Sequence, residues 1–284
     1  MRMNYLGKLN TKHGSFNFCH FDQYIGMALR EYGEFSEIEL SIMEKFIMKG
    51  DVVLDIGANI GCFTVPFSKK VGNKGKVLAF EPQKFIYELL KKNIDCNELK
   101  NTTIFNNAVG KNHKSFELEE FDYSKLGNFG GIGLGENYDN SLIASTKNSK
   151  KYKVQTLTLH DFLYLKKCNF VKIDVELMEM EVLKGGINFI NKFRPIMWIE
   201  NHCEYPNQIN KFLLSNNYNS YWAPTRVYNP QNYFINDTNH YKKIITINTI
   251  AIPKELNKKY VLEGFDKVTN PYSKCTKIFT KTFK

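Results

Sequence analysis

The sequence predicts an α/β fold whose central sheet is mostly parallel. From about residue 50 onward, short apolar runs rich in β-branched residues alternate with segments of helical periodicity, and such alternation is typical of parallel sheets built from βαβ units. The turn DIGANIG (55–61), which contains two glycines, joins the first of these strands to the first helix. The last two apolar runs follow each other with little helical sequence between them, which favours an antiparallel pair at one edge. These observations predict a seven-stranded sheet with helices on both faces.

The first half of the sheet is predicted from three strands and two helices. Strands are expected at VVLDI (52–56), KVLAF (76–80) and TTIFNNAV (102–109), and helices at 60–70 and 86–94. The strands are apolar over most of their length, as expected when both faces of a sheet are covered. In the second helix, apolar residues recur at helical spacing.

The same alternation resumes after residue 168. Gly185 and Gly186 mark the end of a helix, because glycine commonly follows a helix C-terminus. The last two strands form the expected antiparallel edge pair. Strands are expected at 169–173, 195–201, 218–223 and 245–253, and helices at 178–186 and 208–217.

Two segments interrupt this pattern. Residues 1–50 precede the sheet, and there Ser36 and Glu39 form an S-x-x-E capping box, which predicts the start of a helix running toward Met48. Residues 111–152 are rich in loop-forming residues and contain a cluster of glycines.

The chain carries a formal net charge of +10, and half of it lies at one end. After Asp266 there are five lysines and no acidic residue. A solvated basic tail is expected, with contact to an anionic partner as the alternative. Because no repeat or linker divides the chain, we expect one domain. Its parts are an N-terminal segment or lid (1–50), a Rossmann-like core (51–255) and a basic tail (256–284).

Composition also bears on the compartment and on metals. No apolar run approaches the ~20 residues needed to span a bilayer, and the N-terminus lacks the apolar stretch of a secretory signal. A cytoplasmic protein is therefore expected. The six cysteines and six histidines are scattered, with no CxxC or HExxH pair. We expect reduced, mostly buried thiols and predict no metal site from these residues.

The DIGANIG turn is the strongest signal for a ligand. Gly57 and Gly61 permit backbone conformations and close ligand approach that a Cβ would block, and Asn59 tolerates left-handed geometry. The turn lacks the G-x-G-x-x-G pattern of dinucleotide sites. Asp55 is expected at the mouth of the site, where its carboxylate would repel phosphate and attract a cation. S-adenosylmethionine, which carries a sulfonium, an ammonium and no phosphate, fits this turn.

Two further strand ends are expected to hold the rest of this nucleoside. Glu81 and Pro82 follow the second strand, and an acid at that place accepts hydrogen bonds from ribose hydroxyls. Asn107 and Ala108 end the third strand, where the amide could bind adenine beside an apolar wall.

These motifs together resemble one family. DIGANIG, AFEP, NNAV, KIDVE followed by EVLKGG, and INTIAIPKE resemble the FkbM-type methyltransferases, as do YGEFSEIE (32–39) and NFGG (128–131). The resemblance covers roughly residues 24–255. It implies a class I methyltransferase fold and methyl transfer from S-adenosylmethionine to hydroxyls, often on sugars or secondary metabolites.

The sequence departs from the family pattern at two positions. Leu177 stands where the family usually has glycine after DVE, and this change could narrow the site. His160 replaces an acid beside Asp161, for which a structural role is expected.

Carboxylates after the fourth strand are the first candidates for catalysis. Asp174 or Glu176 could align the acceptor hydroxyl or remove its proton, and His202 is the alternative base. Glu200 is expected to contact cofactor or substrate. Glu34 and Glu37, in the N-terminal segment that resembles the family, are expected to close over the methionine end of the cofactor. The resemblance further implies that Asn128, Phe129 and Gly130 contact the acceptor.

Two other functions remain open from the sequence. A nucleic-acid methyltransferase is suggested by the net charge. After the fourth strand, enzymes that methylate bases tend to share an N/D-P-P-Y/F motif, whereas this chain has IDVE. Nucleic acid is therefore not the expected partner. A cofactor-binding module without activity is the second alternative. The acceptor and the oligomeric state stay unassigned, as does metal dependence, since Asp174 and Glu176 could also hold a divalent ion.

Overall fold

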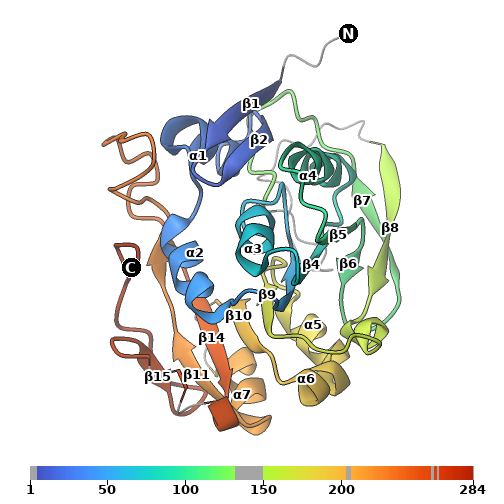
Figure 1. The fold of residues 1–284 in the computed structure, drawn as a ribbon, viewed down its shortest axis with the longest axis vertical. Coiled ribbons are helices and arrows are strands. Elements are labelled where there is room, and N and C mark those ends of the chain that lie inside the picture. Colours follow the sequence, from blue (N-terminus) through green and yellow to red (C-terminus); the bar gives the residue numbers. More distant parts are fainter. Residues whose placement is uncertain (1–4, 132–149, 203–205, 257–258, 261, 284) are drawn as a thin grey trace.

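The computed structural model describes residues 5–131, 150–202, 206–256, 259–260 and 262–283. Its centre is an eight-stranded sheet in the order β15-β11-β14-β10-β9-β3-β4-β5 (Figure 1). The five strands from β10 to β5 are parallel neighbours, which confirms the expected fold class. The strands are β3 (Val52–Ile56), β4 (Lys76–Phe80), β5 (Thr102–Phe105), β9 (Phe170–Ile173), β10 (Ile196–Glu200), β11 (Tyr218–Trp222), β14 (Asn248–Pro253) and β15 (Asp266–Val268).

Helices cover both faces of this sheet because alternate strand residues point to opposite sides. In β3, Val53 packs in the cluster that contains α2 and α3, whereas Leu54 packs in the cluster that contains α5, α6 and α7. Figure 1 shows α2, α3 and α4 in front of the sheet. The helices are α1 (Ile25–Tyr32), α2 (Glu37–Met43), α3 (Thr64–Val71), α4 (Lys84–Cys96), α5 (Glu179–Gly185), α6 (Ile187–Phe193) and α7 (Gln208–Ser215). The helix α6 was not predicted, because the helix expected at 178–186 ends before it.

The third predicted strand (102–109) is divided, contrary to expectation. β5 ends at Phe105, and β6 (Ala108–Val109) pairs with β8 (Lys151–Leu157) in another sheet. Between them, the Asn106 side-chain amide donates hydrogen bonds to the Glu81 and Pro82 carbonyls. The chain therefore turns away from β4 at this point. β8 also pairs with β7 (Ser115–Glu119), so the part of the 111–152 segment that the structure describes is less loop-rich than expected.

The N-terminal segment contains a hairpin that the sequence did not predict. β1 (Leu6–Thr11) and β2 (Gly14–Cys19) pair antiparallel, and Phe16 and Phe18 of β2 pack with Leu90 of α4. The segment is therefore packed against the core along α4.

The predicted capping box is wrong, although a helix does begin after Ser36. Ser36 has a left-handed φ of 48° and makes no side-chain cap, and Glu39 turns away to accept hydrogen bonds from Thr225, Thr246 and Asn248. The helix ends at Met43 and continues as one short 3₁₀ turn, η1 (Glu44–Phe46).

The C-terminal end differs from the expected solvated tail. The predicted antiparallel pair of β11 and β14 is confirmed, and β15 adds an eighth strand beside β11. Further along, the backbone of Phe279 exchanges hydrogen bonds with Pro224 and Arg226, and Phe279 packs against Phe265. The aromatic residues between the lysines hold this end on the protein. The small elements nearby are β12 (Thr225–Arg226), β13 (Ile245–Thr246) and η4 (Lys254–Leu256), and η3 (Leu159–Phe162) precedes β9.

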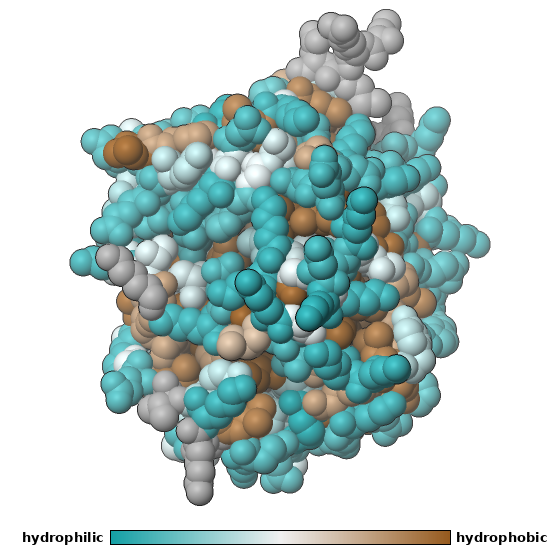
Figure 2. All heavy atoms as spheres, viewed as in Figure 1, coloured by the Kyte–Doolittle hydropathy of each residue, from teal (hydrophilic) through white to brown (hydrophobic). Residues whose placement is uncertain are grey.

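The surface of the described residues is mostly hydrophilic, and most of the described cysteines lie in the interior. Hydrophilic side chains cover most of the face in Figure 2, with hydrophobic atoms in scattered patches. Cys19, Cys62 and Cys168 are buried and form no disulfide among the described residues. Within the described part of the chain, no helix is both long and apolar enough to cross a membrane.

Candidate active site

A cavity of about 350 Å³ opens at the carboxyl ends of the parallel strands, where ligands bind in open α/β sheets. Four strand ends contribute to its lining. Gly57 follows β3, Glu81 follows β4, Asp174 follows β9 and Glu200 ends β10.

The glycine turn after β3 forms the floor of the cavity, as predicted. Gly57 has a φ of 82°, and a Cβ at this position would lie 1.7 Å from the Asp174 carbonyl oxygen. The Gly57 and Ala58 amides donate to the Phe80 carbonyl at 3.0 and 2.9 Å. Asn59 has the expected left-handed φ, 49°, and Gly61, with a φ of 95°, lies against Leu90 outside the cavity lining. Only glycine fits at Gly57.

Glu81 is buried in the wall beside this turn. Its carboxylate accepts hydrogen bonds from the backbone amides of Asn59 at 2.9 Å and Gln83 at 2.8 Å. Burial raises the pKa of Glu81 to about 7. Because each carboxylate oxygen can accept more than one hydrogen bond, Glu81 can still bind a hydroxyl from the cavity.

The other predicted nucleoside contacts also line the cavity, namely Pro82, Asn107 and Ala108. The Asn107 amide already donates to the Gln155 carbonyl at 3.1 Å. Its side-chain oxygen remains the candidate acceptor for a base.

Asp55 does not stand at the mouth, which corrects the prediction. Its carboxylate is fully buried, accepts a hydrogen bond from Thr64 Oγ1 at 2.6 Å, and is absent from the cavity lining. The reason is strand alternation, which turns Asp55 toward the face covered by α3. Asp55 therefore contacts the cavity only through a neighbouring side chain.

That neighbour is Lys172, which the sequence analysis missed. Its Nζ lies 3.5 Å from Asp55 Oδ1 and 3.2 Å from Asp174 Oδ2, and it donates to the Gly57 carbonyl at 3.1 Å. The side chain is only 2% exposed, and Nζ also lies 5.2 Å from the Phe63 ring centroid. Burial opposes its charge, but the attraction of Asp174 and Asp55 outweighs burial and raises the pKa of Lys172. A lysine inside the otherwise apolar FVKI strand was the signal that could have revealed it.

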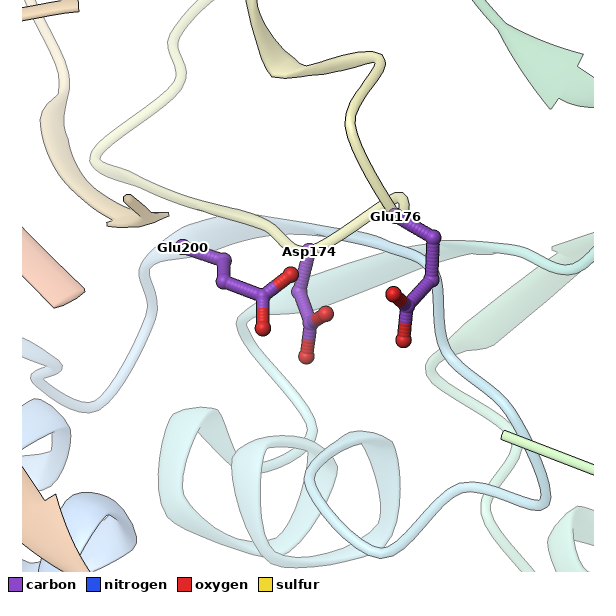
Figure 3. Close-up of side chains that lie close together, drawn as sticks. All are labelled: Asp174, Glu176 and Glu200. Carbon is purple, nitrogen blue, oxygen red and sulfur yellow. The ribbon is translucent and has the colours of Figure 1, made fainter. Parts of the chain in front are cut away.

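Three carboxylates lie together at one end of the cavity, beside the carboxyl ends of β9 and β10. Asp174, Glu176 and Glu200 each bring one oxygen to within 4.8 Å of the others (Figure 3). Burial, followed by repulsion from Asp174 and Glu176, raises the pKa of Glu200 well above its ordinary value. His202 lines the same cavity. The structure thus brings together the residues predicted to act on the acceptor.

The predicted N-terminal acids lie elsewhere. Glu34 accepts a hydrogen bond from Asn229 at 2.7 Å, and Glu37 pairs with Lys12 and His13 at 2.8 and 2.6 Å; neither lines the cavity. Phe35, between them in sequence, does line it. Sequence reasoning therefore found the right segment and the wrong side chains.

Other walls of the cavity come from distant segments. Asn128 and Gly130 of the NFGG loop line it as expected, whereas Phe129 is buried in the core. Sequence reasoning also missed a second set of lining residues, although one of them, Ile247, begins the motif INTIAIPKE. They are Tyr24, Ile25 and Ile245 to Ile247.

The model of the FkbM methyltransferase domain matches residues 55–220, more than half of the chain. The chain belongs to the FkbM methyltransferase family. This confirms the resemblance, and the cofactor of this methyltransferase is S-adenosylmethionine. The cavity fits that molecule, because Glu81 can bind ribose and the carboxylates at the other end favour a positive charge.

One relative and two solved structures that are similar to this chain share at most 27% sequence identity with it. "Methyltransferase 1" of Beauveria bassiana is 27% identical over 146 residues, which span 47% of this chain and 57% of the relative. The chain thus spans little more than half of this curated relative. An FkbM methyltransferase from Methylobacillus flagellatus has a TM-score of 0.44 at 14% identity, over 74% of this chain and 50% of that one. A protein described as a putative rRNA-methylase, from Clostridium thermocellum, has a TM-score of 0.43 at 11% identity, over 76% of this chain and 94% of that one.

Proposed function

We propose that this FkbM methyltransferase transfers a methyl group to a hydroxyl of a sugar, a glycan or a small metabolite. The observation that carries the proposal is the gathering of Asp174, Glu176 and Glu200 in the cofactor cavity. A hydroxyl must lose its proton as it is methylated, and nearby carboxylates can align it and accept that proton. The cofactor supplies an electrophilic methyl group carried on its sulfonium.

The cofactor half of the cavity is proposed to lie over β3 and β4. Glu81 would accept hydrogen bonds from the ribose, with Pro82 beside it, and Asn107 and Ala108 would contact adenine. The open backbone at Gly57 and Asn59 allows the nucleoside to lie close to the turn. Asp55 contributes indirectly, since it holds Lys172 beneath this turn.

The acceptor half is proposed to lie over β9 and β10. Asp174 is held by Lys172, and its side chain is still 37% exposed, so it can face a hydroxyl. The proton goes to Asp174 or to His202, with Glu176 and Glu200 orienting the acceptor. Asn128 and Gly130 close the other side of the cavity.

Incubation of the protein with radiolabelled S-adenosylmethionine and fractionated glycans, metabolites and RNA tests the proposal. Label is expected in a product whose methyl group resists base and is assigned as an ether by mass spectrometry. Asp174→Asn should retain S-adenosylhomocysteine binding and lower turnover about 100-fold or more. His202→Gln should leave turnover nearly unchanged if Asp174 takes the proton. A methylated nitrogen or carbon atom would contradict hydroxyl transfer.

RNA is included as an acceptor because the chain has a formal charge of +10. Cationic surfaces attract nucleic acid without selecting a sequence. Label in RNA, lost with Asp174→Asn, would favour nucleic-acid methylation over the proposed acceptors.

A further inference from the structure

We propose that Asp174, Glu176 and Glu200 form a binding site for one divalent cation that prefers oxygen ligands, such as Mg²⁺ or Mn²⁺. The inference goes beyond the proposed function, because it concerns an ion and does not depend on which acceptor is methylated.

The geometry suits a single ion. Asp174 and Glu176 follow β9, and Glu200 ends the neighbouring parallel strand β10, so the three side chains emerge at the same edge of the sheet. One oxygen from each lies within 4.8 Å of the others. Ligand distances of about 2.1 Å for Mg²⁺ place opposite oxygens roughly 4.2 Å apart and adjacent oxygens roughly 3 Å apart. Small movements of these side chains would therefore bring all three oxygens into contact with one ion.

Glu200 provides a second observation that points to a missing partner. Part of this side chain reaches the cavity, but its Oε2 is buried and has no hydrogen-bond partner among the described residues. Leaving a buried carboxyl oxygen without a partner is costly. In Figure 3 the Glu200 carboxyl group is turned toward Asp174. A cation between these groups would supply the partner that Oε2 lacks.

The balance of charge points the same way. Lys172 is the one lysine or arginine among the described residues that line the cavity, and it is shared between Asp174 and Asp55. Its one positive charge therefore stands against five carboxyl groups, namely Asp55 and the four that line the cavity, Glu81, Asp174, Glu176 and Glu200. A proton shared by Glu200 and Asp174 would remove one negative charge, whereas a divalent ion would offset two and contact Glu176 as well.

Mn²⁺ binding to the full chain, freed of metal by a chelator, tests the site. Electron paramagnetic resonance of free Mn²⁺ is expected to show one bound ion per chain, displaced by excess Mg²⁺. Glu200→Gln and Glu176→Gln should each weaken Mn²⁺ binding about tenfold or more, because each removes a charged ligand. Glu181→Gln is the matched control. This exposed acid of α5 pairs with Lys184 outside the cavity, and its loss should leave binding unchanged.

Circular dichroism verifies that each variant is folded, and if Glu200→Gln fails to fold, Glu176→Gln alone decides. If Mn²⁺ does not bind, or binds the variants as tightly as the wild type, the proposed cation site is wrong. A proton shared with Asp174 would then account for the unpaired Oε2 of Glu200. Because the measurement needs no acceptor, its failure is distinct from failure of the proposed methyl transfer.

Discussion

Leu177 has a backbone conformation that ordinarily suits glycine. Its φ is 71°, and its side chain is 55% exposed. Glycine, which the family usually has at this position, adopts a positive φ without steric cost. A bulky residue in the left-handed region costs roughly 1–2 kcal/mol, and the exposed side chain recovers little of that by packing.

Replacing Leu177 with glycine is expected to stabilise the protein. Removing the steric strain outweighs the greater entropy that glycine gives the unfolded chain, for a net gain of about 1 kcal/mol. Urea denaturation gives the free energy of unfolding. Leu126→Gly is the control, because Leu126 is also exposed but has no positive φ, and it should bring no gain. Equal effects of the two substitutions would contradict the strain at Leu177.

At the scale of elements, strands were predicted well where their sequence is uniformly apolar. β3 and β4 have the predicted bounds. The hairpin β1–β2 was missed because it is polar and only partly buried along much of its length. For the site, motifs located the strand ends. Lys172 and Phe35 lie within the motifs KIDVE and YGEFSEIE, but a motif does not say which of its side chains reach the cavity, so both needed the tertiary structure.

Asn93 joins three elements that sequence patterns treat separately. Its side-chain oxygen accepts hydrogen bonds from the backbone and side-chain amides of Asn17 in β2. Its side-chain amide donates to the carbonyls of Asn17 and Ile60, the latter in the glycine turn. α4 therefore holds the N-terminal hairpin and the glycine turn through one buried amide.

Asn93→Ala is expected to destabilise the protein by about 3 kcal/mol, because it leaves buried backbone groups without partners. Hydrogen exchange should accelerate in β2 and at the glycine turn together. Asn216→Ala, which removes a hydrogen bond to Phe212 at the end of α7, should cost less and leave exchange in β2 unchanged. Faster exchange confined to α4 would show that the amide does not couple these elements.

For the whole molecule, buried carboxyl groups link stability to pH. Burial raises the pKa of Glu39 to about 7 from an ordinary value of 4.5, and that of Asp22 to about 6 from 3.8. The folded protein keeps these protons to higher pH than the unfolded chain does. Stability from Glu39 is therefore fully present below pH 4.5 and is lost as pH rises to about 7.

The free energy of unfolding is thus expected to fall between pH 5 and 7.5, as measured by urea denaturation. Glu39→Gln should flatten this fall by up to about 3 kcal/mol, because glutamine can still accept the hydrogen bonds of Thr225 and Asn248 without ionising. Glu117→Gln, on exposed β7, controls for the loss of one negative charge. A fall of the same size in Glu39→Gln and wild type would exclude Glu39 as its source.

The walls contributed by Tyr24, Phe35 and Ile245 to Ile247 lie outside the 55–220 stretch that defines the family. A polypeptide trimmed to that stretch would also lose β14, which lies between β10 and β11 in the central sheet, so the flanks complete the sheet as well as the cavity. Residues from both flanks therefore complete the wall of the cavity.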